Sequence, residues 1–229
     1  MELPIILLHG ALGSAAQLEP LAAALSSNFE VHALHFEGHG TRPSDRPFSM
    51  EAFSENVIRF MEEKRITKAN FFGYSMGGYV ALTTALNHPE MVGKVFTYGT
   101  KFDWTPESSE REVKMLNAEK ILQKVPQFAQ HLIHLHGEKN WKQLLQKTGE
   151  MMLDLGNGKA FSDDQLRSIH TPVRLSIGTK DHMVSIEETQ RVADLLPNGK
   201  LQVLEEWTHP VEKLDTSFLK QALTEFYKV

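Results

Sequence analysis

The strongest constraint in this sequence is the alternation of short, continuous apolar runs with segments of helical periodicity. The runs lie at residues 3–8, 31–36, 69–74, 94–99, 173–178 and 201–205. Several are apolar throughout rather than at every second residue, which is typical of strands buried on both faces of a parallel sheet. Strand, helix and strand repeated in this way predict an α/β fold with a doubly wound sheet.

Three of the intervening segments carry the 3.6-residue period of an amphipathic helix, at 18–25, 50–60 and 219–226. Ser185 with Glu188 three residues later is a capping box, which predicts that a further helix begins there. The chain has 229 residues, 41% of them hydrophobic and 23% charged, so its length suits one large α/β domain with a small insertion.

The segment from about 101 to 161 interrupts this rhythm because it contains helical patterns and no good strand candidate. Pro126 and Gly137 separate its helices, and about sixty residues are too many for a plain loop. We therefore expect a helical cap at 101–161, inserted between two strands and lying over their carboxyl ends. The core domain would then comprise 1–100 and 162–229.

Residues 73–78 read Gly-Tyr-Ser-Met-Gly-Gly and fit the G-x-S-x-G pattern of a nucleophile elbow, with Ser75 at its centre. An apolar run precedes the motif and a helical segment, 76–87, follows it, which is the context that the motif requires. Such a tight turn projects the serine hydroxyl above the sheet and needs small neighbours. The alternative is a glycine-rich turn that only packs a helix on a strand.

A serine needs a base to take its proton, and His209 is the best-placed of the 11 histidines. It follows the last apolar run in a loop, and Pro210 disfavours helical geometry at His209. Asp181 lies in the loop after the preceding run and is the predicted acid, which would orient the imidazole and stabilise its charged form. The alternative for His209 is an ordinary surface-loop residue.

Asp103 is a second candidate for the acid because it lies just past the apolar run at 94–99. Triads are recognised by geometry rather than by order in the chain, so the sequence leaves this alternative open. The order Ser75, Asp181, His209 favours Asp181.

An oxyanion hole is expected from two backbone N–H groups, those of Met76 and Ala11. Met76 directly follows the candidate nucleophile, and Ala11 lies in the turn after the first apolar run. We expect His9 to brace this turn by hydrogen bonding rather than to act in catalysis.

Together these features resemble the α/β-hydrolase superfamily, in its small serine esterase and carbon–carbon hydrolase branch. The matching features, in chain order, are His9-Gly10 with Gly13, the Gly-His-Gly turn at 38–40, residues 73–78, and Asp181 with His209. Family members usually begin with two further strands. Because the first apolar run here starts at Leu3, the resemblance implies a core of about six parallel strands.

The resemblance implies a serine hydrolase, carboxylesterase-like, that cleaves an ester or related acyl bond of a small, largely apolar substrate through an acyl-enzyme. One alternative is a carbon–carbon bond hydrolase or lyase with the same triad. The menaquinone-pathway synthase is similar around 73–78, but that family carries arginine where this chain has Tyr79. The other alternative is a ligand receptor with slow turnover.

The cap contains four large apolar side chains that either line a substrate pocket or only pack the cap against the core. They are Trp104, Phe128, Trp141 and Met152. Three histidines of the cap, His131, His134 and His136, suggest a metal site, but no carboxylate pattern supports it. We expect them on a solvated face, and we expect neither a metal nor a cofactor.

A net charge of −5 without blocks of like charge gives no indication of nucleic acid or anionic membranes as partners. The first apolar run is too short for a membrane span and lacks the basic residues of a signal peptide. We therefore expect a cytoplasmic protein that acts on a small molecule as a monomer or homodimer.

Overall fold

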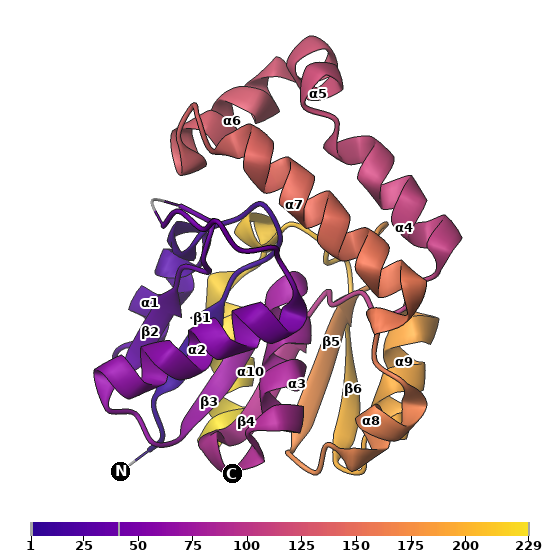
Figure 1. Ribbon diagram of the computed structural model, residues 1–229. Helices are drawn as coiled ribbons and strands as arrows, with labels where there is room; N and C mark the ends of the chain where they lie inside the picture. Colours follow the sequence, from indigo (N-terminus) through magenta and orange to yellow (C-terminus); the bar gives the residue numbers. More distant parts are fainter. Residues whose placement is uncertain (1, 41, 229) are drawn as a thin grey trace.

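The centre of the computed structural model, which describes residues 2–40 and 42–228, is a six-stranded parallel sheet (Figure 1). Its strands are β1 (Ile5–Leu8), β2 (Val31–Leu34), β3 (Ala69–Tyr74), β4 (Val92–Tyr98), β5 (Val173–Gly178) and β6 (Gly199–Leu204). They lie in the order β2-β1-β3-β4-β5-β6, and every neighbouring pair is parallel. The predicted doubly wound α/β sheet is confirmed.

The strand order reverses between β1 and β3, which lie side by side although β2 separates them in the chain. In open α/β sheets, ligand sites form at the carboxyl ends of the strands where the order reverses. The turn after β1 and the turn after β3 therefore meet at the point where a site is expected.

Strand ends differ from the predicted ones where backbone pairing, rather than hydrophobicity, sets the boundary. β1 begins at Ile5 instead of residue 3. Pro4 has no N–H to donate to a strand ladder, and its carbonyl accepts a hydrogen bond from the Asn70 N–H at 2.8 Å. β2 ends at Leu34, after which the chain turns toward Gly38.

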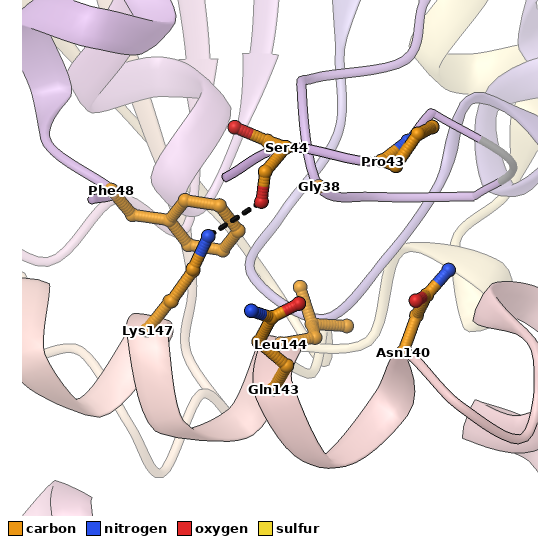
Figure 2. A pocket seen from close by; sticks show the side chains of 8 residues that line it. All are labelled: Gly38, Pro43, Ser44, Phe48, Asn140, Gln143, Leu144 and Lys147. Atoms are coloured by element: carbon orange, nitrogen blue, oxygen red, sulfur yellow. Dashed lines mark hydrogen bonds between the residues drawn. The ribbon is translucent and has the colours of Figure 1, made fainter. Parts of the chain in front are cut away.

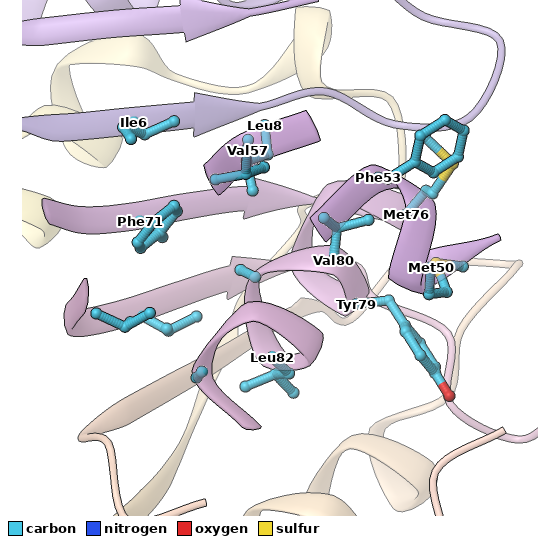
Figure 3. Close-up of a cluster of buried hydrophobic side chains, with 14 of the residues drawn as sticks. Ile6, Leu8, Met50, Phe53, Val57, Phe71, Met76, Tyr79, Val80 and Leu82 are labelled. Atoms are coloured by element: carbon cyan, nitrogen blue, oxygen red, sulfur yellow. The ribbon is translucent and has the colours of Figure 1, made fainter. Parts of the chain in front are cut away.

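Helices cover both faces of the sheet, and alternate residues of β1 show why its sequence is apolar throughout. Ile6 and Leu8 join a cluster with side chains of α2 and α3 (Figure 3), to which α9 also contributes, whereas Ile5 and Leu7 pack against α1 and α10. All four side chains are fully buried. The helices are α1 (Glu19–Leu25), α2 (Met50–Lys64), α3 (Met76–Asn87), α8 (Asp163–Ser168), α9 (Ile186–Leu195) and α10 (Thr216–Lys228).

The segment between β4 and β5 is helical, and its described residues contain no strand. It forms α4 (Pro106–Val113), α5 (Ala118–Lys124), α6 (Pro126–His136) and α7 (Trp141–Asp154), which gather at one end of the molecule in Figure 1. We call these four helices the cap. Its contacts with the turns after β1 and β2 place it at the carboxyl edge of the sheet. The division into a core domain (1–100 and 162–229) and a cap insertion (101–161) stays a prediction.

Candidate active site

Ser75 lies in the turn between β3 and α3, in a backbone conformation that a side chain rarely adopts. Its φ is 50° and its ψ is −116°. Such strain persists only where the surroundings hold it. The Ser75 N–H donates to the Tyr98 carbonyl at 2.8 Å, and its own carbonyl accepts from the Thr100 hydroxyl at 3.0 Å. Both contacts come from β4 and the residues directly after it, so the neighbouring strand fixes the strained turn.

The glycines of the motif are needed because backbone segments approach one another closely. A Cβ atom at Gly77 would lie 2.2 Å from the Leu8 carbonyl oxygen, and one at Gly73 would lie 2.4 Å from the Cα of Gly78. Neither atom is a flexible side-chain end that could move away. The motif therefore lets α3 begin directly against β1 and β3.

His209 and Asp181 are brought together by the loops that follow β6 and β5. The His209 Nδ1–H donates to Asp181 Oδ2 at 2.7 Å, so Nε2 is the nitrogen left free to take a proton. The Asp181 side chain is fully buried, and its other oxygen accepts from the N–H groups of Met183 and Val184 at 2.8 and 3.0 Å. These donors fix the carboxylate, which in turn fixes the imidazole.

The imidazole lies next to the elbow. The ring centroids of His209 and Tyr74, the residue before Ser75, are 5.5 Å apart. Gly99 has a left-handed φ of 60°, and a Cβ there would lie 3.1 Å from His209 Nδ1 and 3.2 Å from Asp181 Oδ2. Glycine at this position therefore leaves room for the pair at the end of β4.

The alternative acid, Asp103, does not reach the imidazole. Its carboxylate instead pairs with the Arg191 guanidinium at 3.0 Å, and its side chain is half exposed. The carboxylate in contact with His209 is that of Asp181.

The turn after β1 lies close to Ser75. A Cβ at Gly10 would lie 3.4 Å from the Cβ of Ser75. Within the described residues, neither the Ala11 N–H nor the Met76 N–H donates to a backbone carbonyl. That these two groups form an oxyanion hole stays a prediction.

His9 braces this turn from within the core. Its Nδ1–H donates to the Gly10 carbonyl at 2.8 Å, and its Nε2 accepts from the Phe36 N–H at 3.3 Å. Burial lowers the pKa of His9 to about 3, so the ring is neutral, as a ring nitrogen that accepts must be. The Gly10 carbonyl also accepts from Gly13 at 3.2 Å. Because the peptide unit is planar and trans, these two bonds direct the Ala11 N–H to the opposite side.

The side chains predicted to line a pocket lie in different environments. Trp141 is 2% exposed and packs inside the cap with Ile121, Leu132 and Leu145, so it belongs to the core of the cap rather than to an open cavity. Phe128 is 39% exposed, Met152 is partly buried, and Trp104 packs on the main core. Their role as pocket residues stays a prediction.

The expectation of a solvated face was wrong for His136 and right for the exposed His131 and His134. His136 is 2% exposed because the spacing of Ala129, Leu132 and His136 puts it on the buried stripe of α6. That spacing was the signal available in the sequence. Among the described residues, no three side chains are grouped so that they could hold a metal ion.

A second polar contact between cap and core was also missed. Lys147 of α7 donates to the carbonyls of Ser44 and Arg46 at 2.5 and 2.9 Å, beside a small cavity also lined by Phe48 and Leu144 (Figure 2). Its side chain is only 9% exposed. A lysine on a predicted helix is usually exposed, so the sequence gives no indication of such a contact.

A family model described as alpha/beta hydrolase fold matches residues 4–112. This region includes Ala11 and Ser75 but ends before Asp181 and His209. Among the described residues, no helix combines the length and the apolar character needed to cross a bilayer.

The sn-1-specific diacylglycerol lipase ABHD11 of Xenopus laevis is 34% identical over 94 residues, which are 40% of this chain and 30% of that protein. The chain thus spans under a third of the length of this curated relative. The Bacillus subtilis protein named "Uncharacterized hydrolase YugF" is 22% identical over 245 residues, 98% of this chain and 89% of that one.

Among solved structures, the enol-lactonase from Burkholderia xenovorans LB400 superimposes with a TM-score of 0.80. The match covers 100% of this chain and 93% of the lactonase at 17% sequence identity, which is a likeness of fold. The six-stranded parallel sheet, the strained elbow, the family match over residues 4–112 and the likeness to the lactonase agree, and the chain has the α/β-hydrolase fold.

Proposed function

We propose that this chain is a serine hydrolase that cleaves an ester or related acyl bond of a small, largely apolar molecule through an acyl-enzyme. The observation that carries the proposal is the hydrogen bond between His209 and the buried Asp181 at the same sheet edge as the strained Ser75. This combination supplies a nucleophile, a general base and the group that orients the base.

In the first half of the reaction, the Ser75 hydroxyl oxygen attacks the acyl carbon while its proton passes to His209 Nε2. Asp181 stays ionised and stabilises the imidazolium. The N–H groups of Ala11 and Met76 donate to the oxyanion of the tetrahedral intermediate. The intermediate collapses, His209 gives the proton to the leaving alcohol, and Ser75 carries the acyl group.

In the second half, a water molecule gives a proton to His209 and attacks the acyl-enzyme. Collapse of the second tetrahedral intermediate returns the proton to Ser75 and releases the carboxylic acid. The donors at Ala11 and Met76 serve both steps, because the oxyanion forms at the same place each time.

The test is hydrolysis of p-nitrophenyl esters of graded acyl length by the wild-type chain and by Ser75→Ala. We expect the variant to keep the thermal unfolding midpoint of the wild type and to lose about six orders of magnitude in kcat. The exposed Ser27→Ala variant is the matched control and should retain full activity.

A fluorophosphonate probe should label the wild type at Ser75 and leave Ser75→Ala unlabelled. Steady turnover in the Ser75→Ala variant contradicts the proposal. A single burst without further turnover would identify a slow receptor instead, and cleavage of vinylogous diketones in preference to esters would identify a carbon–carbon hydrolase.

A further inference from the structure

His136, the last residue of α6, ties the cap to two turns at the carboxyl edge of the sheet. Its Nε2–H donates to the Leu12 carbonyl at 2.9 Å, and its Nδ1 accepts from the Gly40 N–H at 2.9 Å. Leu12 belongs to the turn after β1 and Gly40 to the turn after β2. One buried imidazole thus connects three segments that lie far apart in the sequence.

Leu12 is also held by the cap through its side chain. Its φ of 59° lies in the left-handed region, which is unfavourable for a residue with a Cβ. The side chain packs both against the main core and against the core of the cap, where Ile133 of α6 joins the same cluster. The cap therefore contacts this strained residue in two ways, by a hydrogen bond to its carbonyl and by apolar packing against its side chain.

The position of Leu12 bears directly on the Ala11 N–H. Ala11 precedes Leu12 in a turn closed by the hydrogen bond from the Gly13 N–H to the Gly10 carbonyl. A change in the backbone angles of Leu12 would open this turn and redirect the Ala11 N–H. Oxyanion donors act only when they are aimed at the developing charge, and a displacement of about 1 Å can cost about a hundredfold in rate.

We propose that His136 is a positioning residue: it holds the turn that carries the Ala11 N–H, so that the oxyanion hole is complete only when the cap is seated. The inference rests on the proposed serine-hydrolase function, which supplies the role of Ala11. His136 touches no reacting atom and acts through Leu12.

The surroundings of His136 keep its ring neutral, which this geometry needs because Nδ1 must accept. Burial is the main cause that lowers the pKa of His136, and the charges of His131 and His35 lower it further. The ring of His39, itself buried and with a lowered pKa, lies 6.0 Å away edge-on.

Two substitutions separate the hydrogen bonds from the bulk of the ring. In His136→Gln the amide oxygen and nitrogen have about the same separation as the two ring nitrogens, so one can accept from Gly40 and the other donate to Leu12. In His136→Phe the ring stays and both bonds are lost. His134→Phe, on the same helix but exposed, is the matched control.

We expect His136→Phe to lower kcat for a p-nitrophenyl ester by about ten- to a hundredfold with KM changed less than twofold. His136→Gln should recover kcat to within about threefold, and His134→Phe should match the wild type. A wild-type kcat in His136→Phe, or equal losses in the Phe and Gln variants, overturns the proposal.

Ile133→Ala tests the same contact from its apolar side and is the milder change, should His136→Phe not fold. It should lower kcat severalfold at constant KM. An unchanged kcat in this variant contradicts the inference.

Amide hydrogen exchange gives a readout that needs no substrate. Protection of the Gly13 and Gly40 N–H groups should fall about tenfold in His136→Phe and persist in His136→Gln. If the wild type hydrolyses no ester while this loss is observed, the proposed function fails and the docking of the turn stands. If Ser75-dependent hydrolysis is present but exchange and kcat do not change, the inference fails alone.

Discussion

The elbow at Ser75 and the contact between cap and core are built in different ways. At the elbow, backbone lies against backbone, and Gly77 leaves no room for even a methyl group beside the Leu8 carbonyl. At the cap, two polar side chains, His136 and Lys147, reach across to backbone groups of the core. Apolar residues such as Leu144 and Met151 add to the main core beneath them.

This difference indicates where the molecule tolerates change. A contact between two backbones cannot adjust to a new side chain, whereas a side-chain contact to a carbonyl can be replaced by water at moderate cost. We expect substitutions at the elbow and its partners to act strongly on rate or folding. Substitutions at the contact between cap and core should act by changing how the cap packs on the core.

After that of Ser75→Ala, the largest effect is expected at the acid. Asp181→Asn should lower kcat by about four orders of magnitude, because an amide cannot hold His209 in the tautomer that leaves Nε2 unprotonated. Asp103→Asn is the matched control and should stay within about twofold, because that carboxylate pairs with Arg191 at the surface. Ester hydrolysis by the two variants decides the matter, and the reverse result would move the acid to Asp103.

A pair of glycine substitutions compares the two regions directly. Gly77→Ala should destabilise the fold by about 3 kcal/mol, because its Cβ would lie 2.2 Å from the Leu8 carbonyl oxygen. Gly149→Ala in α7 should instead stabilise by about 0.5–1 kcal/mol, since its Cβ would meet Val113 at an ordinary 3.5 Å. Urea unfolding measures the change in the free energy of unfolding for both variants. Equal changes would contradict the proposed difference between elbow and cap.

Acid should weaken the region where core and cap meet, through its buried histidines. Burial lowers the pKa of His9 to about 3 and holds that of His39 well below its ordinary 6.5. Below pH 6.5 these two histidines therefore bind protons in the unfolded chain but stay neutral in the folded chain. The free energy of unfolding thus falls as pH falls. From pH 6.5 to 5 the shift at His9 should cost about 2 kcal/mol, and His39 should add to this loss in the same direction.

The free energy of unfolding, measured by urea titration across this pH range, tests the point. His39→Phe should fill the space between Phe36, Phe48 and Phe53 and make the pH dependence of the free energy of unfolding shallower. An unchanged slope in His39→Phe would mean that this histidine does not contribute.

A small loss of stability is expected at the second contact of the cap. Lys147→Met keeps the apolar stem and loses the hydrogen bonds to Ser44 and Arg46, which should cost about 1 kcal/mol of stability. KM for an ester should change more than kcat, because Lys147 does not touch the oxyanion turn. Lys142→Met, which removes an exposed pair with Glu119, is the control and should have no measurable effect.

Much of the fold follows from local patterns. β3, α3 and β5 have the predicted bounds, and the capping box at Ser185 begins α9 with both of its hydrogen bonds present. These elements were predictable because steric propensity, capping and hydrophobic period act within a few residues. The ends of β1 and β2 were less predictable, because they depend on where pairing with a neighbouring strand stops.

The candidate site was predictable in part for the same reason. The elbow is a local motif, and the late loops of the sheet suggested Asp181 and His209 together, which the structure places in contact. The sequence left Asp103 open because both carboxylates follow apolar runs. Only the position of Arg191 on α9 shows where the Asp103 carboxylate goes.

The sequence by itself determined the alternation of strands and helices, the elbow and its glycines, because these depend on the chain's immediate neighbours. Only the tertiary structure decided that His136 faces inward and holds Leu12 and Gly40. The physical reason is that a side chain's burial and its partners depend on segments that folding brings together. A contact across 124 residues of chain leaves no mark on the local pattern at either end.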